Sequence, residues 1–427
     1  YDGGTYGALE RVACHVADPG DAPRETFWRI AAKQAVLAAG AIERGIAFRD
    51  NDRPGVMTAG AVRTYLHRYG VAPGRKVAVF GNNDEARRTA EDLQAAGVRV
   101  TTLVDTREDA PGGDVPWIAG GRVVGTKGRR GLQAVTVAHK GGERVVEAEC
   151  LAVAGGWNPS VHLTCHMNGR PVWRDDIAAF VPADGAVPGL TPCGAAAGVF
   201  DTAGCLKDGL RAAAEALKAL GLSVPRQSAP SAEDRTYTVD PVWHVPGKGR
   251  AWLDFQNDVT VKDIKQAAAE NFRSVEHMKR YTTQGMATDQ GKNSNVAALA
   301  VLADATGRTI PETGTTTFRP PYTPVSIAAY GAGAEGAGFQ PQRFTTSHTA
   351  SVARGAPMIE AGLWYRPSYF PAPGETTWRE ACDREVDMVR NAVGVADVST
   401  LGKIDIQGPD AGAFLDFVYT NMFSTLK

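Results

Sequence analysis

Gly81, Asn83 and Ala86 occupy the three positions of a G-x-G-x-x-G/A pattern, in which small residues let the turn after a strand approach a pyrophosphate. The outer two residues suit this chemistry, but Asn83 puts a side chain where bare backbone is needed. Asp84 and Glu85 follow it, so the chain itself supplies the negative charge that a helix N-terminus attracts. This stretch therefore predicts a dinucleotide-binding β-α-β unit that has lost its ligand.

A loop of small residues, GAAAGVFDT from Gly194 to Thr202, is the second candidate for cofactor chemistry. Its glycines and alanines allow the backbone to approach a ligand, and the ring of Phe200 can cover an apolar group. The helix expected to be capped by Asp201 or Thr202 would favour the anionic part of a cofactor at its N-terminus. The same small residues also suit close packing of a helix against a strand, so both interpretations stay open.

The segment YTTQGMATDQGKNSN, residues 281–295, concentrates groups that can bind a phosphate. A flavin phosphate needs backbone N–H groups, hydroxyls and a cation in one place, and this stretch leads into a helix N-terminus. From composition alone, a capped loop between two helices with a solvated lysine is the simpler interpretation. The candidate residues are Thr282, Thr283, Gly285, Thr288, Gln290, Gly291 and Lys292.

The cysteines and histidines predict neither a metal site nor a redox dithiol. The six cysteines form no C-x-x-C pair, and their dispersal argues against a pyridine-nucleotide disulfide reductase. His162, Cys165 and His166 imitate zinc ligands, but the chain offers no second pair at zinc spacing. We therefore predict no metal ligand and no catalytic residue. The cysteines are Cys14, Cys150, Cys165, Cys193, Cys205 and Cys382.

Length and composition set the class of protein. With 427 residues and a hydrophobic fraction of 43%, the chain is long enough for about three domains of ~150 residues. The net charge of −1 gives no sign of a nucleic acid or an anionic membrane as a partner, and no apolar run approaches the roughly 18 residues of a membrane span. We expect a soluble, cytoplasmic protein. The missing initiator Met and the stop directly after an amphipathic helix predict an internal fragment that lacks both ends.

The elements that position the candidate residues begin with an α/β region. It spans residues 1–222 and contains an inserted second dinucleotide domain at about 70–150. A buried strand at 34–38 leads into the turn at Gly40. The alternation around Gly141 predicts a hairpin, and the apolar run CLAVAGG after it predicts a further buried strand.

Four segments follow the α/β region. We expect a proline-rich linker at 223–250, a small helical module at 251–317, a second linker at 318–340 and the N-terminal part of an α+β domain at 341–427. This last domain should contain the helix WREACDREVDMVRNAVG, the strand KIDIQG and the helix DAGAFLDFVYTNMF.

Helix caps mark the helical module most clearly. Thr260 and Ser274 each precede a helical pattern, and a third helix should begin near Asn293 or Ser294. These caps place the 281–295 segment between two helices.

Read in order, these segments resemble one family, the alpha subunits of heterotetrameric sarcosine oxidases. The resemblance rests on AAGAIERGIAF, NDRPGVM, VAVFGNNDEARRTAEDL, AGGWNPSVHL, CGAAAGVFDTAGCLKDGL, TVKDIKQAAAENFRSVEHMKRYTTQGMATDQGKNSN and VGVADVSTLGKIDIQGPDAGAFLDFVYTN. It covers essentially the whole chain, and the order of three unlike modules makes it specific. It implies a disulfide-reductase-like Rossmann fold with two dinucleotide-binding domains, a helical module at a partner interface, and the start of an aminomethyltransferase-like, folate-binding α+β domain.

The resemblance also implies a function. The family forms complexes that contain FAD, FMN and NAD, oxidise sarcosine to glycine, pass the one-carbon unit to tetrahydrofolate and form peroxide. The amine is oxidised at FAD in the beta subunit, and FMN lies between alpha and beta, so beta, gamma and delta subunits are the implied partners. The alternatives are a related secondary-amine oxidase or dehydrogenase, of the dimethylglycine or opine type, and a cofactor-free structural subunit that docks a flavoprotein.

The resemblance also implies where the cofactors bind. It implies FMN at the 281–295 loop, shared with the beta subunit. The β-α-β unit that carries the NAD pyrophosphate would precede Tyr1, and most folate-contacting positions would follow Lys427, so the tetrahydrofolate site is incomplete here. NAD contacts fall on positions matching Ala195, Phe200 and Thr202, to which we add Gly194, Gly198 and the turn at Gly40.

One comparison concerns iron. Related amine and cyanide-forming dehydrogenases carry a C-x-C-E segment before a Val-Thr pair, as ligands of an iron–sulfur cluster. The corresponding residues here read DFQNDVT, so Asp254 and Gln256 stand in place of both thiolates. We therefore expect no cluster in this module.

Overall fold

The computed structural model describes residues 7–13, 26–112, 114–232, 236–325, 336–338 and 340–426. The chain divides into two compact units, one formed mainly by residues 28–325 and one mainly by residues 326–427. The strands β1 (Gly7–Ala13) and β2 (Thr26–Ala32) form a two-stranded sheet. None of the helices in the described part of the chain has the length and apolar character that crossing a bilayer requires.

A five-stranded parallel sheet forms the centre of the predicted second dinucleotide domain. Its order is β5 (Val56–Thr58), β12 (Cys150–Ala154), β6 (Lys76–Gly81), β7 (Arg99–Asp105) and β8 (Trp117–Ala119). Every residue of β12 is buried, as expected for a parallel strand that is covered on both faces. The predicted strands on either side of the degenerate glycine motif and the CLAVA strand are thereby confirmed.

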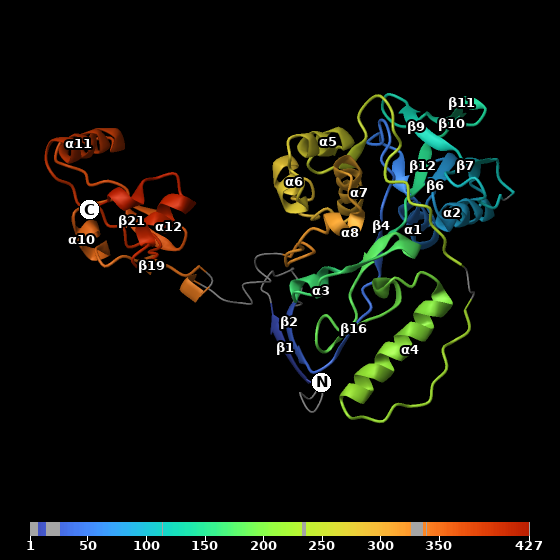
Figure 1. Ribbon diagram of the computed structural model, residues 1–427, viewed down its shortest axis with the longest axis horizontal. Coiled ribbons are helices and arrows are strands. Elements are labelled where there is room, and N and C mark those ends of the chain that lie inside the picture. Colours follow the sequence, from blue (N-terminus) through green and yellow to red (C-terminus); the bar gives the residue numbers. More distant parts are fainter. Residues whose placement is uncertain are drawn as a thin grey trace. The chain divides into compact units, whose positions relative to one another are not determined.

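The two faces of this sheet have different covers (Figure 1). Helices α1 (Ala59–Tyr69) and α2 (Asp84–Ala95) pack on one face, over Val77, Val79 and Leu103. A three-stranded antiparallel sheet covers the other, and its turn between β10 and β11 confirms the predicted hairpin. Its strands are β9 (Arg122–Lys127), β10 (Ala134–His139) and β11 (Gly142–Glu147).

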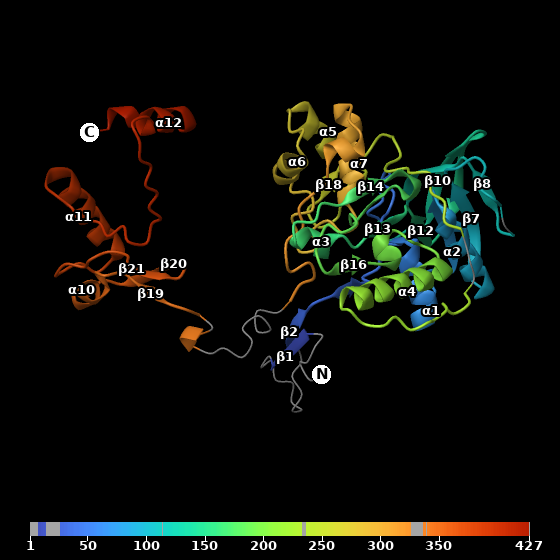
Figure 2. The same ribbon diagram turned by 60° about the horizontal axis from the view of Figure 1, so that its bottom comes forward.

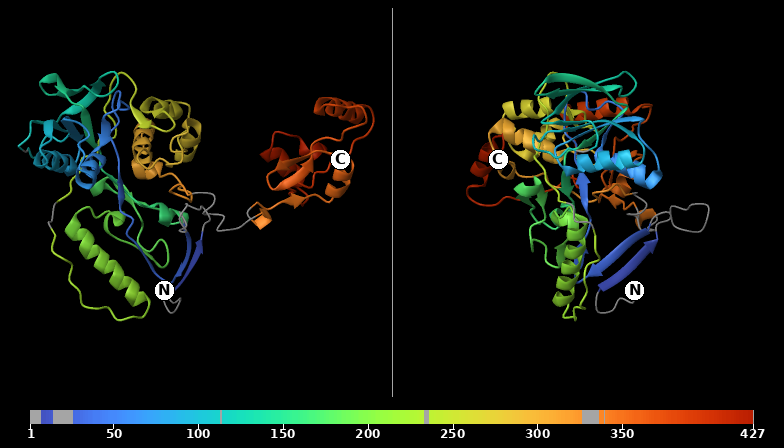
Figure 3. Two further views of the ribbon diagram at one scale, coloured as in Figure 1. Left: turned by 180° about the vertical axis from the view of Figure 1, so that it is seen from behind. Right: turned by 90° about the vertical axis from the view of Figure 1, so that its right-hand side faces the viewer.

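A second, smaller group of strands carries the predicted NAD loop. The strands β3 (Ala35–Leu37) and β16 (Leu190–Pro192) pair in parallel, and β4 (Ala41–Glu43) pairs antiparallel with β13 (Trp157–Pro159). Helix α4 (Thr202–Ala219), drawn in light green in Figure 3, follows the loop. Its N-cap is Asp201, one of the two residues predicted.

Short elements complete this region. They are α3 (His162–His166), β14 (Val172–Arg174), the 3₁₀ turn η1 (Asp175–Ile177), β15 (Ala179–Val181) and the 3₁₀ turn η2 (Gly194–Ala197). The residues Ile177, Ala179 and Val181 form a small core against which Phe200 packs.

The helical module consists of α5 (Val261–Ala269), α6 (Val275–Thr282), α7 (Asn295–Thr306) and α8 (Ile310–Thr313), preceded by β17 (Trp252–Asp254) and β18 (Val259–Thr260). Figure 2 shows α5, α6 and α7 grouped together, apart from α1 and α2. The N-caps are Thr260, Ser274 and Ser294, as predicted. Helix α7 is buried on all sides from Asn295 to Ala303, so the other helices pack around it.

The proline-rich segment before the module follows the α/β region closely. The Asp240 N–H donates to the carbonyl of Asn82 at 3.0 Å, and the Val245 N–H donates to the carbonyl of Ala47 at 2.7 Å. The Trp243 carbonyl in turn accepts from the Ala47 N–H at 3.1 Å. We call residues 236–245 the strap, because they bond to the α/β region while Trp243 packs against the core of the helical module.

The second unit has a small sheet of β19 (Arg343–Phe344), β21 (Trp364–Pro367) and β20 (Met358–Ala361), with α10 (His348–Ala353), α11 (Trp378–Asn391) and α12 (Ala411–Val418). Two 3₁₀ turns, η3 (Gly336–Gly338) and η4 (Phe423–Thr425), lie near its ends. The prediction of a strand KIDIQG was wrong, since residues 403–408 are irregular. Ile404 is 88% exposed there, so the alternating pattern has no neighbouring strand to pair with.

Candidate functional site

Asn83 is the N-cap of α2 and is fully buried. Its side-chain Oδ1 accepts from the Glu85 N–H at 3.0 Å, and its Nδ2 donates to the carbonyl of Ala154 at 2.9 Å. Gly81 and Ala86, the outer positions of the motif, pack closely against each other, since a Cβ on Gly81 would lie 2.5 Å from the Cβ of Ala86. The strand, turn and helix are thus those of a dinucleotide unit, with the turn filled by an amide side chain.

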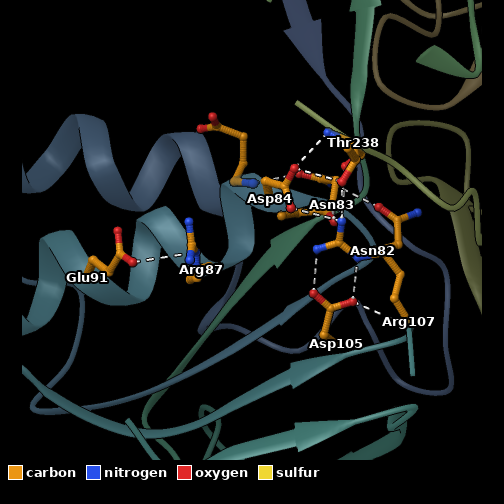
Figure 4. A network of polar contacts seen from close by, with 10 residues as sticks. Asn82, Asn83, Asp84, Arg87, Glu91, Asp105, Arg107 and Thr238 are labelled. Carbon is orange, nitrogen blue, oxygen red and sulfur yellow. Dashed lines mark hydrogen bonds and ion pairs between the residues drawn. The ribbon is translucent and has the colours of Figure 1, made fainter. Parts of the chain in front are cut away.

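Charged groups of this chain surround the N-terminus of α2 (Figure 4). Asp84 accepts from Arg107 Nη1 at 2.9 Å and from the Thr238 N–H of the strap at 2.7 Å. The Arg107 guanidinium also binds Asp105 with two hydrogen bonds, of 3.0 and 2.8 Å. Burial alone would lower the Arg107 pKa, but the two aspartates outweigh it and raise that pKa above its ordinary value. Side chains and the strap therefore occupy the place where a dinucleotide unit holds pyrophosphate.

The predicted NAD elements lie at the carboxyl ends of two adjacent parallel strands. The Cys193 N–H, just after β16, donates to the Leu37 carbonyl at the end of β3 at 3.0 Å. Gly40 follows β3 with a φ of 71° and accepts from the Ser160 N–H at 3.0 Å. The structure therefore brings the Gly40 turn and the start of the 194–202 loop to the same edge, where open α/β sheets bind ligands.

Two of the NAD candidates line one small cavity. Phe200 and Thr202 border a space of about 100 Å³ with Glu85, Arg88 and Tyr237. The rings of Phe200 and Tyr237 meet edge to face at 5.0 Å. The Tyr237 hydroxyl is buried without a hydrogen-bond partner in the described part of the chain, and burial raises its pKa.

The small residues of the loop have packing roles that the structure makes explicit. Gly198 has a φ of 81°, and a Cβ there would lie 2.8 Å from Ile177. The Gly194 N–H donates to Asp208 of α4 at 2.7 Å, with Ala195 next to it in the same 3₁₀ turn. Gly194, Ala195 and Gly198 are absent from the lining of the small cavity, so they shape the loop while Phe200 and Thr202 border the space.

Asp254 organises the loop that was predicted to bind FMN. It is 1% exposed, and its carboxylate accepts from three backbone N–H groups: Gly285 at 2.7 Å, Gln256 at 2.9 Å and Asn257 at 3.1 Å. A carboxylate with this many donors folds a loop around itself. Asp254, which stands where the sequence comparison expected a cysteine ligand, therefore fixes the backbone of this loop.

Backbone geometry accounts for the two glycines of this loop. Gly285 and Gly291 have φ values of 66° and 68°, and a Cβ at either would overlap Oδ1 of Asn295. Thr283 caps the end of α6 with a φ of 63°. These positions make the loop compact, with its N–H groups turned toward the chain's own acceptors.

Polar side chains of the loop mostly bind other parts of this chain. Gln290 donates from Nε2 to the carbonyls of Arg319 and Pro321, at 2.7 and 3.0 Å, and accepts from the Arg319 N–H at 2.9 Å. Thr282 donates to the Met278 carbonyl at 2.9 Å, and Thr288 contacts Gln256 at 3.4 Å. Gln290 thereby anchors residues 319–321.

Lys292, the predicted cation, lies over an aromatic ring. Its Nζ is 4.5 Å from the centre of the Tyr322 ring, which stacks on His162 at 3.6 Å. Burial, His166 and Lys292 lower the pKa of His162 to about 4. Within the described ranges no three His, Cys, Asp or Glu side chains gather as metal ligands would.

The structure adds a buried pair that sequence reasoning missed. Arg44 is fully buried and donates to the carbonyls of Gly155 and Trp157, at 3.0 and 3.1 Å, and to Asn158 Oδ1 at 2.9 Å. Its neighbour Glu43 accepts from the Gly60 N–H at 2.6 Å. In the sequence, this pair could have been recognised as two adjacent charged residues directly after the apolar run AAGAI.

Burial disfavours the charged forms of Glu43 and Arg44 and therefore shifts their pKa values in opposite directions. Burial raises the pKa of Glu43 to about 8 and lowers that of Arg44 to about 10. The guanidinium also lies over the Trp243 ring of the strap, 4.6 Å from its centre. Arg44 therefore ties β4 to β13 and to the strap at once.

Comparisons with known proteins extend over the whole chain. Residues 248–334 match the family described as "Sarcosine oxidase A3 domain", and residues 347–427 match "GCVT N-terminal domain". The full chain is similar to sarcosine oxidase subunit alpha from Rhizobium meliloti (strain 1021), with 47% identity over 436 residues, and from Corynebacterium sp. (strain P-1), with 42% identity over 458 residues. These matches cover 44% and 46% of the two relatives, so the chain spans somewhat under half of their length.

Among solved structures, the chain is similar to L-proline dehydrogenase from P. horikoshii. The TM-score is 0.55 at 22% sequence identity, and the match covers 76% of this chain and 65% of that one. This likeness supports a Rossmann-like α/β fold, which the strand order already indicates.

Proposed function

Because this chain is a homologue of sarcosine oxidase subunit alpha along its whole length, we propose that it is part of a multi-subunit amine oxidase and contributes cofactor sites while the amine is oxidised on a partner. The proposed reaction converts sarcosine to glycine, passes the one-carbon unit to tetrahydrofolate and forms peroxide. Beta, gamma and delta subunits are the proposed partners. The match of residues 347–427 to a GCVT N-terminal domain supports the folate branch.

We place NAD at the 194–202 loop and the Gly40 turn. The observation that carries this proposal is their common position at the carboxyl ends of β3 and β16. Phe200 and Thr202 would border the cofactor, and Gly198 would keep the loop close to the core of Ile177 and Val181.

The NAD proposal is tested by Ala195→Trp in the full-length subunit within its complex. The indole should block the loop, so NAD released from the purified complex should fall to near zero. Ala213→Trp, on the exposed side of α4, is the matched control and should leave NAD content unchanged. A normal NAD content in Ala195→Trp would refute the proposal that NAD binds at this loop.

We place FMN beside the 281–295 loop, with Lys292 as the cation for its phosphate. Bound FMN would supply electron transfer to oxygen, while Lys292 would hold the phosphate and Thr288 would offer a hydroxyl. Lys292 would exchange its contact with Tyr322 for the phosphate. A charge-assisted hydrogen bond of this kind contributes about 1.5–3 kcal/mol, which corresponds to roughly 10- to 100-fold in affinity.

The FMN proposal is tested by Lys292→Met in the complete complex. FMN released per FAD should fall sharply at low free FMN and recover when FMN is added in excess. Lys265→Met, exposed on α5, is the control and should retain full FMN. Full occupancy with normal peroxide production in Lys292→Met would make the loop purely structural.

A second candidate is a structural subunit that binds no cofactor and docks a flavoprotein. The N-terminus of α2 favours the structural candidate for the second dinucleotide domain, because Asp84 there already bonds to Thr238 and Arg107. NAD retained by the full-length subunit after it is separated from its partners by gel filtration distinguishes the two candidates, because a purely structural subunit would carry none.

A further inference from the structure

Two cysteines come together where the 194–202 loop meets α4. Cys193 follows β16 directly, and Cys205 lies in the first turn of α4. A Cβ on Gly194, the residue next to Cys193, would lie 3.5 Å from the Cys205 Sγ and 3.8 Å from its Cβ. The two thiols are also close enough to interact electrostatically. The fold therefore pairs two thiols that a whole loop separates in the sequence.

Hydrogen bonds anchor the backbone of both cysteines. The Cys193 N–H donates to the Leu37 carbonyl of β3 at 3.0 Å. The Cys205 N–H donates to the carbonyl of Asp201, the N-cap of α4, also at 3.0 Å. Both side chains therefore start from fixed positions, and they can meet without unfolding β16 or α4.

The Cys205 thiol also holds the loop in its present shape. Its Sγ donates to the Val199 carbonyl at 3.1 Å, and the Val199 N–H donates to the Gly194 carbonyl at 3.1 Å. These two bonds close the 194–199 turn against the first turn of α4. A sulfur in a disulfide has no hydrogen to donate, so a bond between Cys205 and Cys193 must release the Val199 carbonyl.

The environment of the pair determines which oxidant level it answers. Cys193 is 4% exposed, whereas Cys205 is half-buried and is the first that a small oxidant reaches. Burial and the Asp201 carboxylate raise the pKa of Cys205, and burial and the Asp208 carboxylate raise that of Cys193. Because the thiolate is the reactive form, the pair stays reduced at low oxidant and reacts only when the oxidant accumulates.

We propose that Cys193 and Cys205 form a disulfide when the subunit meets accumulated hydrogen peroxide, and that this bond opens the 194–202 loop. Peroxide converts the Cys205 thiol to a sulfenic acid and is reduced to one water. The Cys193 sulfur then attacks the Cys205 sulfur, the S–S bond forms, and the S–OH bond breaks. The hydroxyl leaves with the Cys193 proton as a second water, so one peroxide takes up the two electrons of two thiols.

The choice of peroxide, and the consequence for the cofactor, rest on the proposed function. In that function the complex forms peroxide and the 194–202 loop binds NAD. In the reduced protein Phe200 and Thr202 border the small cavity of about 100 Å³. Opening the loop removes this border, so the oxidised subunit should release NAD. A thiol reductant should reverse the change by exchange with the disulfide.

One proteolytic fragment makes the bond directly measurable. Residues 175–207 contain both cysteines and no internal lysine or arginine, so trypsin releases them together. The full-length subunit in its assembled complex is treated with hydrogen peroxide in the absence of amine. Remaining thiols are alkylated, and the fragment is weighed before and after reduction. Hydrogen exchange of the 194–199 turn measures loop opening, and bound NAD is measured separately.

Peroxide should remove two hydrogen atoms from this fragment and protect both cysteines from alkylation. The turn should exchange faster in the oxidised sample, and NAD content should fall several-fold. Cys193→Ser and Cys205→Ser should abolish all three changes, and Cys193→Ala repeats the first variant without a hydroxyl at the buried position. Cys382→Ser, at a half-buried cysteine of the second unit, is the matched control and should respond as the parent does.

A fragment that keeps two alkylatable thiols in excess peroxide, or that gains oxygen without a cross-link, would overturn the proposal. A cross-link that leaves exchange of the 194–199 turn unchanged would overturn it as well. Neither readout involves NAD. A cross-linked and open loop with unchanged NAD content would therefore support the disulfide and count against the NAD site, which keeps the two failures distinguishable.

Discussion

The carboxylate of Asp254 accepts the backbone N–H of Gly285 at 2.7 Å and so joins the end of β17 to the loop after α6. Two further N–H groups, of Gln256 and Asn257, point to the same carboxylate. One buried anion thus sets the shape of both segments that border a cavity of about 370 Å³ next to Asp289.

Replacing Asp254 by Ala should therefore loosen the helical module. Three backbone N–H groups lose their acceptor, among them the buried one of Gly285, and we expect a loss of stability on the order of 3 kcal/mol. Hydrogen exchange of the peptide that contains Gly285 should accelerate, and thermal unfolding of the full-length subunit should begin earlier. Asp258→Asn, at an exposed position next to this site, should change neither measurement. Unchanged exchange at Gly285 in Asp254→Ala would refute this role.

Glu43 should make stability depend on pH. Folding raises its pKa from the ordinary value of 4.5 to about 8, mainly through burial. The folded protein then holds this proton more tightly than the unfolded chain does, so the stabilisation is complete below pH 4.5 and is lost as the pH rises through about 8. Within this window the slope approaches about 1.4 kcal/mol per pH unit.

Glu43→Gln should remove that slope. The variant should match the parent near pH 4.5 and be more stable than the parent at pH 8, as followed by urea unfolding across the range. Glu143→Gln, exposed on β11, should keep the parent's profile. A parent whose stability stays flat between these pH values would contradict the assignment.

Arg107→Ala should destabilise the protein far more than a matched surface change. It leaves Asp105 buried without its bidentate partner and frees Asp84 and the strap, so we expect a cost of about 3 kcal/mol. Arg87→Ala breaks an exposed pair with Glu91 and should cost less than about 0.5 kcal/mol. Chemical unfolding of both variants measures the difference, and equal costs would show that the buried network is not stabilising.

Local patterns predicted the elements that depend on neighbours in sequence. The β6-α2-β7 unit follows from its apolar periodicity, and the caps Thr260 and Ser274 follow from side chains that bind backbone within the first helical turn. The placement of Gly40 beside the 194–202 loop followed only from the resemblance. In this structure it results from β3 pairing with β16, which is far away in sequence.

Long-range contacts account for what the sequence did not reveal. The strap has the composition of a linker, and its bonds to Asp84 and Ala47 join residues that composition cannot pair. Arg44 finds its acceptors in Gly155 and Trp157 by the same kind of distant contact. The cavity next to Asp289 is assembled from several separate segments, so no single motif marks it.

The strap also determines how this chain can be divided. A break between residues 223 and 232 separates Thr238 from Asp84 and the Trp243 ring from Arg44, although no helix or strand is cut. Each piece would then expose a surface complementary to the other. Two polypeptides produced separately with this junction should therefore reassociate when mixed, which makes the proline-rich stretch a natural position for a split version of the subunit.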